Sequence, residues 1–192
     1  MKNVVILVNG NWNDDDNQER SLLTTVVWLR ELFACAAISK EDQVVRYMDG
    51  VGSGGIVDKA LGGVFGRGLK DGICAAYQAA SEEYVDGDKI YFFVFSRGAY
   101  TVRTAADMIA SVGLVDLCGV ADPEKRTDIC QTLYKVYKKE AEVHEIGAVP
   151  FFNADTPQVA VGKTEIHLVG VWDAVGTAGI PDRYRIQNAF DG

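Results

Sequence analysis

The sequence predicts an α/β fold, a mostly parallel sheet flanked by helices. Short apolar runs rich in β-branched residues alternate along the chain with longer segments of helical periodicity. The apolar runs are nearly continuous, as expected for strands buried on both faces of a parallel sheet. Neither repeats nor a Pro/Ser-rich linker interrupt this alternation, so we expect one domain over residues 1–192.

The first half of the chain is expected to contain two strands, each followed by a helix. NVVILV (Asn3–Val8) is a continuous apolar run and predicts a buried strand. After a polar loop, apolar residues at helical spacing predict a helix over Arg20–Ala37. Gln43–Met48 predicts a second, short strand. A glycine-rich loop is then expected over Asp49–Gly68, before a helix over Leu69–Tyr84.

The second half repeats the pattern. KIYFFVF (Lys89–Phe95) predicts a third strand, and Arg97–Val112 a helix that Gly113 ends. Thr127–Val143 has the spacing of an amphipathic helix, and EIHLVGVW (Glu165–Trp172) predicts the fourth strand. Because parallel sheets carry their chemistry beyond the carboxyl ends of the strands, the loops after these strands are the first places to search for function.

Composition excludes several classes of protein. With 48% hydrophobic and 24% charged residues, the chain is too apolar to be disordered, yet it has no apolar run long enough for a transmembrane helix. Its first residues lack the pattern of a signal peptide, so we expect none there. The net charge of −8 disfavours nucleic acid as a partner. Four cysteines without a CxxC pair speak against structural zinc and are typical of a reducing compartment, so we expect the chain to be cytoplasmic as made.

The third predicted strand runs directly into Ser96, Arg97 and Gly98, where a helix is expected to open. A serine at a sharp strand-to-helix turn is the geometry of the nucleophile elbow. The amide of Arg97 would then face the oxyanion, and Gly98 would allow the turn to pack tightly. Val94 replaces the first glycine of G-x-S-x-G and would crowd the turn unless its neighbours are small. Ser96 as a helix N-cap is the alternative, and the pentapeptide alone leaves both open.

VFSRGAYTVR (Val94–Arg103) resembles the G-F-S-R-G-A-Y-x-x-R signature of the α/β-hydrolase family that includes type VI secretion phospholipase effectors. Further segments resemble the same family in order along the chain: NGNWN (Asn9–Asn13), with Asn9 where Asp is common, YMDGVGSGG (Tyr47–Gly55), GGVFGRGL (Gly62–Leu69), YVDGDKIYFF (Tyr84–Phe93) and LVGVWDAVGTAGIP (Leu168–Pro181). The resemblance implies an α/β-hydrolase-like fold and a serine hydrolase of lipid or phospholipid esters.

The resemblance also implies that Asp173, in GVWDAVG, is the acid of a Ser-His-Asp triad. Asp173 follows the fourth strand directly, so its carboxylate is expected at the same sheet edge as Ser96, although a turn cap is the alternative role. Neither histidine suits the role of base: His167 is expected inside the fourth strand, and His144 in a charged surface segment. Either the hydrolase-like fold is truncated at its C-terminus before the histidine, or the chain is a non-catalytic relative.

Gly10 and Asn11 follow the first strand and are candidates for a second oxyanion donor; Gly10 as an ordinary turn residue is the alternative. Gly50–Gly55 satisfies G-x-G-x-x-G, but further glycines follow where a dinucleotide-binding fold needs a helix. Asp14–Asp16 lacks the glycine and distal glutamate of a calcium loop. We therefore expect neither a cofactor nor a metal.

The leading hypothesis is a serine hydrolase in which Ser96 attacks a carboxylic ester, by resemblance that of a lipid. Peripheral contact with a membrane and a protein partner are both compatible with it, and the resemblance implies delivery into another cell if the chain is a secretion effector. The first alternative is a hydrolase-like binding or scaffold module without turnover. A nucleotide-binding α/β domain is the third hypothesis.

Overall fold

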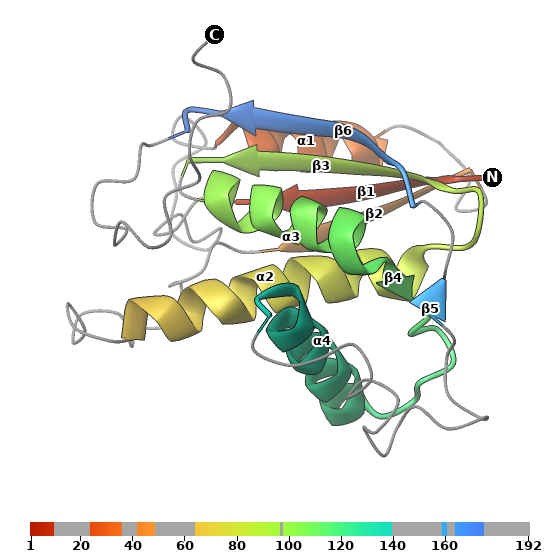
Figure 1. Ribbon diagram of the computed structural model, residues 1–192. Coiled ribbons are helices and arrows are strands. Elements are labelled where there is room, and N and C mark those ends of the chain that lie inside the picture. The colour runs from red at the N-terminus through yellow and green to blue at the C-terminus, as the bar shows by residue number, and fades with distance from the viewer. Residues whose placement is uncertain are drawn as a thin grey trace, which may run out of the picture.

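The computed structural model of the protein describes residues 1–9, 24–35, 42–48, 64–96, 98–139, 159–160 and 164–174 (Figure 1). Its main sheet has the strand order β2-β1-β3-β6. These strands are β1 (Asn3–Val8), β2 (Gln43–Met48), β3 (Lys89–Phe95) and β6 (Ile166–Trp172). All three neighbouring pairs are parallel, so the carboxyl ends of the four strands lie at one edge, on the left in Figure 1. The expected α/β fold with a parallel sheet is confirmed.

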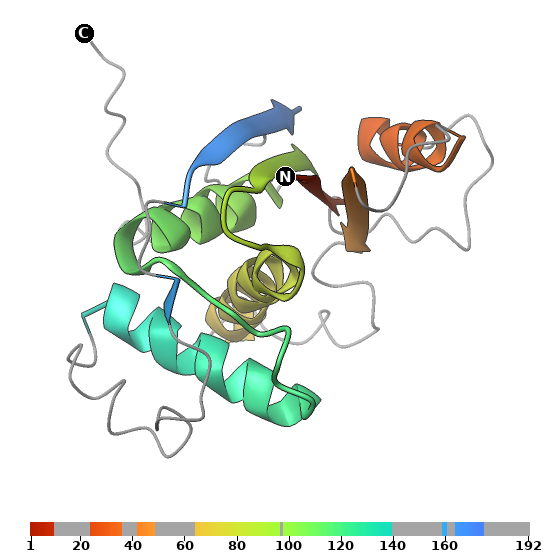
Figure 2. The same cartoon turned by 90° about the vertical axis from the view of Figure 1, so that its right-hand side faces the viewer.

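Helices cover both faces of this sheet. They are α1 (Thr25–Cys35), α2 (Val64–Glu83), α3 (Gly98–Val112) and α4 (Pro123–Tyr137). Figure 2 shows α2 and α3 on one face, α4 packed outside them, and α1 on the opposite face. No helix in the described part of the chain is both long enough and apolar enough to cross a membrane.

The larger core lies between the sheet and the α2–α3–α4 side. Ile6 and Phe92 of the sheet are fully buried there, together with Tyr77 of α2, Met108 of α3 and Leu133 of α4. A smaller cluster under α1 contains Val5, Leu7 and Val26. Successive residues of β1 therefore bury their side chains on opposite faces, which explains why that strand is apolar without interruption.

The first three predicted strands have the predicted bounds, and β6 begins one residue after its predicted start. The sequence did not predict a short antiparallel pair formed by β4 (Leu114–Val115) and β5 (Val159–Ala160). Two residues are too few to produce a periodic signal. Gly113, at φ +77°, ends α3 as expected, and its N–H donates to the Ile109 carbonyl at 2.9 Å.

The boundaries of the helices were predicted less well than those of the strands. α1 begins at Thr25 because Thr24 caps it, whereas the predicted start was Arg20. α2 begins at Val64, so the predicted loop extends too far: its last five residues are helical despite their glycines. α3 spans Gly98–Val112, and its predicted first residue, Arg97, lies outside the described residues.

α4 begins four residues before its predicted start at Thr127 and ends at Tyr137. Asp122 is its N-cap and accepts a hydrogen bond from the amide of Glu124 at 3.0 Å, and Pro123 stands in the first turn, where it needs no N–H partner. The helix was predicted to continue to Val143. It ends earlier because Lys139 has a left-handed backbone (φ +58°) that breaks the helical geometry.

Candidate active site

Ser96 lies in a sharp turn between the end of β3 and the start of α3. Its φ is +56°, in the left-handed region that non-glycine residues rarely adopt, and its side chain is half-buried. An N-cap residue has an extended backbone, whereas the backbone of Ser96 is left-handed. The backbone at Ser96 therefore differs from that of a helix N-cap, which was the alternative role for this serine.

Gly98 permits this turn because no side chain would fit there. A Cβ at position 98 would lie 2.7 Å from Cγ2 of Val94 and 3.3 Å from the carbonyl oxygen of Asn9. Val94, which replaces the first glycine of the elbow pattern, is fully buried and fills the space that Gly98 leaves. The valine is thus accommodated by the glycine four residues later, and it does not prevent the turn.

Asp173 lies beside Ser96 at the same edge of the sheet. β3 and β6 are paired up to Phe95 and Trp172, and the N–H of Ser96 donates to the carbonyl of Trp172 at 2.8 Å. Paired strands are about 4.8 Å apart, so Asp173, the residue that directly follows β6, emerges about one strand spacing from the serine. Asp173 is exposed and also has a left-handed backbone, with φ +48°. Ser96 and Asp173 thus come from segments far apart in the sequence to neighbouring positions.

Aromatic packing fixes β6 against β3 just before this edge. The ring of Phe93 stacks on that of Trp172 with a centroid distance of 5.8 Å. Gly170 lies opposite Phe93, and a Cβ there would come within 2.7 Å of the Phe93 ring. Any other residue at position 170 would therefore require the Phe93 ring to shift, whereas glycine lets the strand before Asp173 pack against β3 as observed.

Asn9 follows β1 directly and is buried, with 1% of its surface exposed. Its Oδ1 accepts a hydrogen bond from Thr24 Oγ1 at 2.7 Å, and its Nδ2 donates to the hydroxyl of Tyr47 at 3.0 Å. These contacts join residues 15 and 38 positions apart, so no local pattern indicates them. A hydroxyl residue directly before an apolar helical segment was the one available signal for Thr24. The oxyanion candidates Gly10, Asn11 and Arg97 lie outside the described residues.

His167 lies far from the edge that carries Ser96. It is the second residue of β6, exposed, with its ring against that of Tyr91 at a centroid distance of 5.1 Å. Six residues of extended strand, roughly 20 Å, separate it from Asp173. His144 lies outside the described residues. The part of the chain that the structure describes therefore places no histidine next to Ser96 and Asp173.

Cysteines do not offer a competing nucleophile in the core. Burial raises the pKa of Cys74 to about 11, and burial also raises the pKa of Cys130. For Cys118, desolvation and the nearby Asp116 carboxylate raise the pKa. A thiol with a raised pKa is protonated at neutral pH and is a poor nucleophile. All four cysteines are free.

Within the described ranges, the structure brings together no group of three or more His, Cys, Asp or Glu side chains that would suit a metal ion. The acidic run Asp14–Asp16 and the glycine run Gly50–Gly55, which the sequence analysis considered as a calcium loop and a nucleotide loop, lie outside those ranges.

Comparison with known proteins identifies the family of the chain. Residues 2–191 match the family model "T6SS, Phospholipase effector Tle1-like, catalytic domain". The chain is also similar to Uncharacterized protein YEL023C of Saccharomyces cerevisiae, with 28% identity over an alignment of 155 residues that covers 72% of this chain and 22% of that protein. The chain thus spans about a fifth of the length of this curated relative. No solved structure matches. Since the family model covers nearly every residue, the chain belongs to the type VI secretion Tle1-like phospholipase effector family, in its catalytic domain.

Proposed function

We propose that the chain hydrolyses lipid esters with Ser96 as the nucleophile and Asp173 as the acid that orients the base. One observation supports this most strongly. Ser96 has a left-handed backbone, and its N–H donates a hydrogen bond to the carbonyl of Trp172, the residue before Asp173. Membership of a phospholipase effector family supports a lipid substrate. The same membership supports a second part of the proposal: the chain is made in the cytoplasm and is then delivered into another cell.

In this mechanism Ser96 Oγ attacks the acyl carbon of the ester and forms the Oγ–C bond while a general base takes the hydroxyl proton. The carbonyl oxygen becomes an oxyanion, for which the amides of Arg97 and of Gly10 or Asn11 are the proposed donors. The base then gives the proton to the leaving alcohol as the C–O bond breaks. Water attacks the acyl-enzyme in the same way, which releases the fatty acid and restores the serine.

The base itself is the part of the triad that the described residues do not supply. We propose a histidine from outside them, since His167 is too distant from Ser96. Asp173 would accept a hydrogen bond from the far nitrogen of that imidazole, which fixes its orientation and stabilises the imidazolium that forms.

The test is covalent labelling of the full-length native protein with a fluorophosphonate probe, together with hydrolysis of short-chain p-nitrophenyl esters and phospholipid vesicles. We expect labelling at Ser96, and Ser96→Ala should abolish it and lower hydrolysis by about a thousandfold or more. Ser111→Ala, an exposed serine in the last turns of α3, is the matched control and should leave both unchanged. Native protein that is folded but takes up no label at Ser96 would reject the proposal.

A second candidate function is a hydrolase-like binding module without turnover. The placement of His167 at the wrong end of β6 is the observation that favours it. In that case the native protein would remain unlabelled, and Ser96→Ala would retain the binding of phospholipid vesicles.

A further inference from the structure

A buried asparagine links three elements next to the nucleophile turn. Asn9 Oδ1 accepts from the Thr24 hydroxyl at 2.7 Å, its Nδ2 donates to the Tyr47 hydroxyl at 3.0 Å, and its backbone N–H donates to the carbonyl of Met48 at 3.0 Å. The partners come from the residue before α1 and from β2. Because both ends of a buried amide are hydrogen-bonded, its side chain keeps one orientation.

The backbone of Asn9 is also part of the wall against which the nucleophile turn packs. Its carbonyl oxygen lies 3.3 Å from the position of a Cβ on Gly98, and β1 and β3 are in register up to Val8 and Val94. A residue with a left-handed backbone, such as Ser96, persists only where its surroundings determine the conformation. A displacement of Asn9 would therefore alter the direction of the Ser96 hydroxyl.

Thr24 and Tyr47 are themselves held in place. The Thr24 hydroxyl, besides donating to Asn9, lies 3.4 Å from the amide of Val27 and caps the first turn of α1. The guanidinium of Arg30, one helical turn further on, lies over the Tyr47 ring at 4.6 Å from its centroid. The start of α1 and the end of β2 thus meet at the side chain of Asn9.

We propose that Tyr47 and Thr24 are positioning residues for the nucleophile: through Asn9 they hold the end of β1 against the Ser96–Gly98 turn. This inference rests on the proposed hydrolase function. Neither hydroxyl contacts the reacting atoms. Their loss should slow the chemical step and leave binding of the fluorophosphonate probe unchanged, because the probe meets the same surface while Ser96 spends less time in the reactive geometry.

The first test compares two tyrosines in the full-length native protein. Tyr47→Phe removes the hydroxyl bonded to Asn9 but retains the ring under Arg30. Tyr77→Phe removes a buried hydroxyl that donates to Gly113 O at 2.7 Å and accepts from Val115 N at 3.1 Å, away from the candidate site. We expect Tyr47→Phe to lower the maximal fluorophosphonate labelling rate of Ser96 roughly threefold to tenfold at an unchanged half-saturating probe concentration. Tyr77→Phe should lower only the urea midpoint.

The second test compares two helix caps. Thr24→Val removes both the cap of α1 and the donor to Asn9, whereas Asp122→Ala removes the cap of α4 alone. Thr24→Val should slow labelling like Tyr47→Phe, and Asp122→Ala should not. Thr24→Ser retains the hydroxyl and should restore the native labelling rate.

The outcomes separate this inference from the proposed function. If the native protein is labelled and Tyr47→Phe reacts as fast as Tyr77→Phe, the positioning role is overturned and the hydrolase proposal stands. Slower labelling by Thr24→Ser as well as Thr24→Val would also contradict it, since the donor is then irrelevant. A native protein without label at Ser96 overturns both proposals.

Discussion

The two ends of the central sheet are built differently. At the carboxyl end, Ser96 and Asp173 lie beside each other with left-handed backbones, a conformation that costs non-glycine residues about 1–2 kcal/mol each. At the amino end, Asp88 accepts hydrogen bonds from the Lys2 amide at 2.7 Å and the Val85 amide at 3.1 Å, and it pairs with the Lys2 ammonium. Of the two ends of the sheet, the one with the left-handed residues is the one where the chemistry is proposed, and charged hydrogen bonds stabilise the other.

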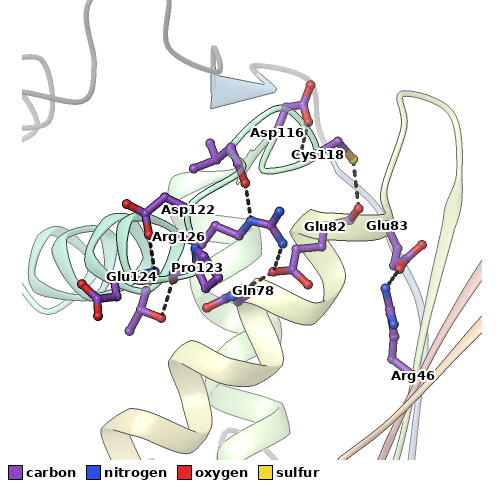
Figure 3. Close-up of polar contacts among 12 residues, drawn as sticks. Arg46, Gln78, Glu82, Glu83, Asp116, Cys118, Asp122, Pro123, Glu124 and Arg126 are labelled. Carbon is purple, nitrogen blue, oxygen red and sulfur yellow. Dashed lines mark hydrogen bonds and ion pairs between the residues drawn. The ribbon is translucent and has the colours of Figure 1, made fainter.

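Figure 3 shows that the stabilising contacts extend over the end of α2. The Glu82 carboxylate accepts from Arg126 at 3.0 Å and from Gln78 at 2.8 Å, and the Cys118 thiol donates to the Glu82 carbonyl at 2.9 Å. Arg126 also donates to the carbonyl of Val120, so one side chain joins α4, the preceding loop and α2. Substitutions at this end should change stability alone, whereas those at the other end should change activity.

The largest expected effect is that of Asp173→Asn. Asparagine tolerates the left-handed backbone at this position, so the fold should remain unchanged. Loss of the carboxylate should lower ester hydrolysis by about 10⁴-fold, because the general base would lose its orientation and charge partner. Initial rates of p-nitrophenyl ester hydrolysis and the thermal midpoint measure the two properties. A large fall in the thermal midpoint together with the loss of hydrolysis would contradict the contrast between the two ends.

Gly98→Ala should affect both properties, because its new Cβ meets Val94 Cγ2 at 2.7 Å. We expect a loss of about 1–3 kcal/mol in the free energy of unfolding, typical of overpacking, and slower labelling of Ser96. Adding Val94→Ala opens space for the methyl group. The double variant should therefore be more stable than the sum of the single effects predicts, by about 1 kcal/mol in urea unfolding. Strict additivity would show that Val94 does not fill the space beside Gly98.

Asp88→Asn should lower the free energy of unfolding by about 2 kcal/mol at pH 7 without changing the labelling of Ser96. Burial would raise the pKa of Asp88, but hydrogen bonds from Lys2 and Val85 outweigh it and hold the pKa below its usual value. A carboxyl group with a lowered folded-state pKa contributes stability above its unfolded pKa of about 4 and loses that contribution as the pH falls further. Urea unfolding from pH 7 to pH 3 should therefore show the two proteins converging. A constant difference would contradict this assignment.

The smallest effect is expected for Arg46→Gln. Arg46 pairs with Glu83 at the end of α2, but 51% of its side chain is exposed, and exposed ion pairs contribute about 0.5 kcal/mol or less. Differential scanning calorimetry should show almost no change, and activity should remain native. A loss comparable to that of Asp88→Asn would mean that exposed pairs at this end contribute as much as buried ones.

The sequence predicted the strands well because β1 is buried on both faces and β3 is buried on one face and half-buried on the other, which demands apolar runs with clear ends. It also placed Ser96 and Asp173 at one edge, since parallel strands align their carboxyl ends. Helix starts were harder. Glycines in the first turns of α2 have a low helix propensity and resemble a loop in the sequence, yet these turns are helical. The contacts of Asn9 with Thr24 and Tyr47 were not predicted because they depend on which strands become neighbours.

The left-handed turn at position 96 restricts which nucleophiles this scaffold can carry. A β-branched side chain is strongly disfavoured at a φ of +56°, so threonine would be excluded there despite its hydroxyl. Cysteine, which is unbranched at Cβ, would meet no such barrier. In relatives that share this turn, we therefore expect the serine hydroxyl to be replaced by the thiol of cysteine, and never by the secondary alcohol of threonine.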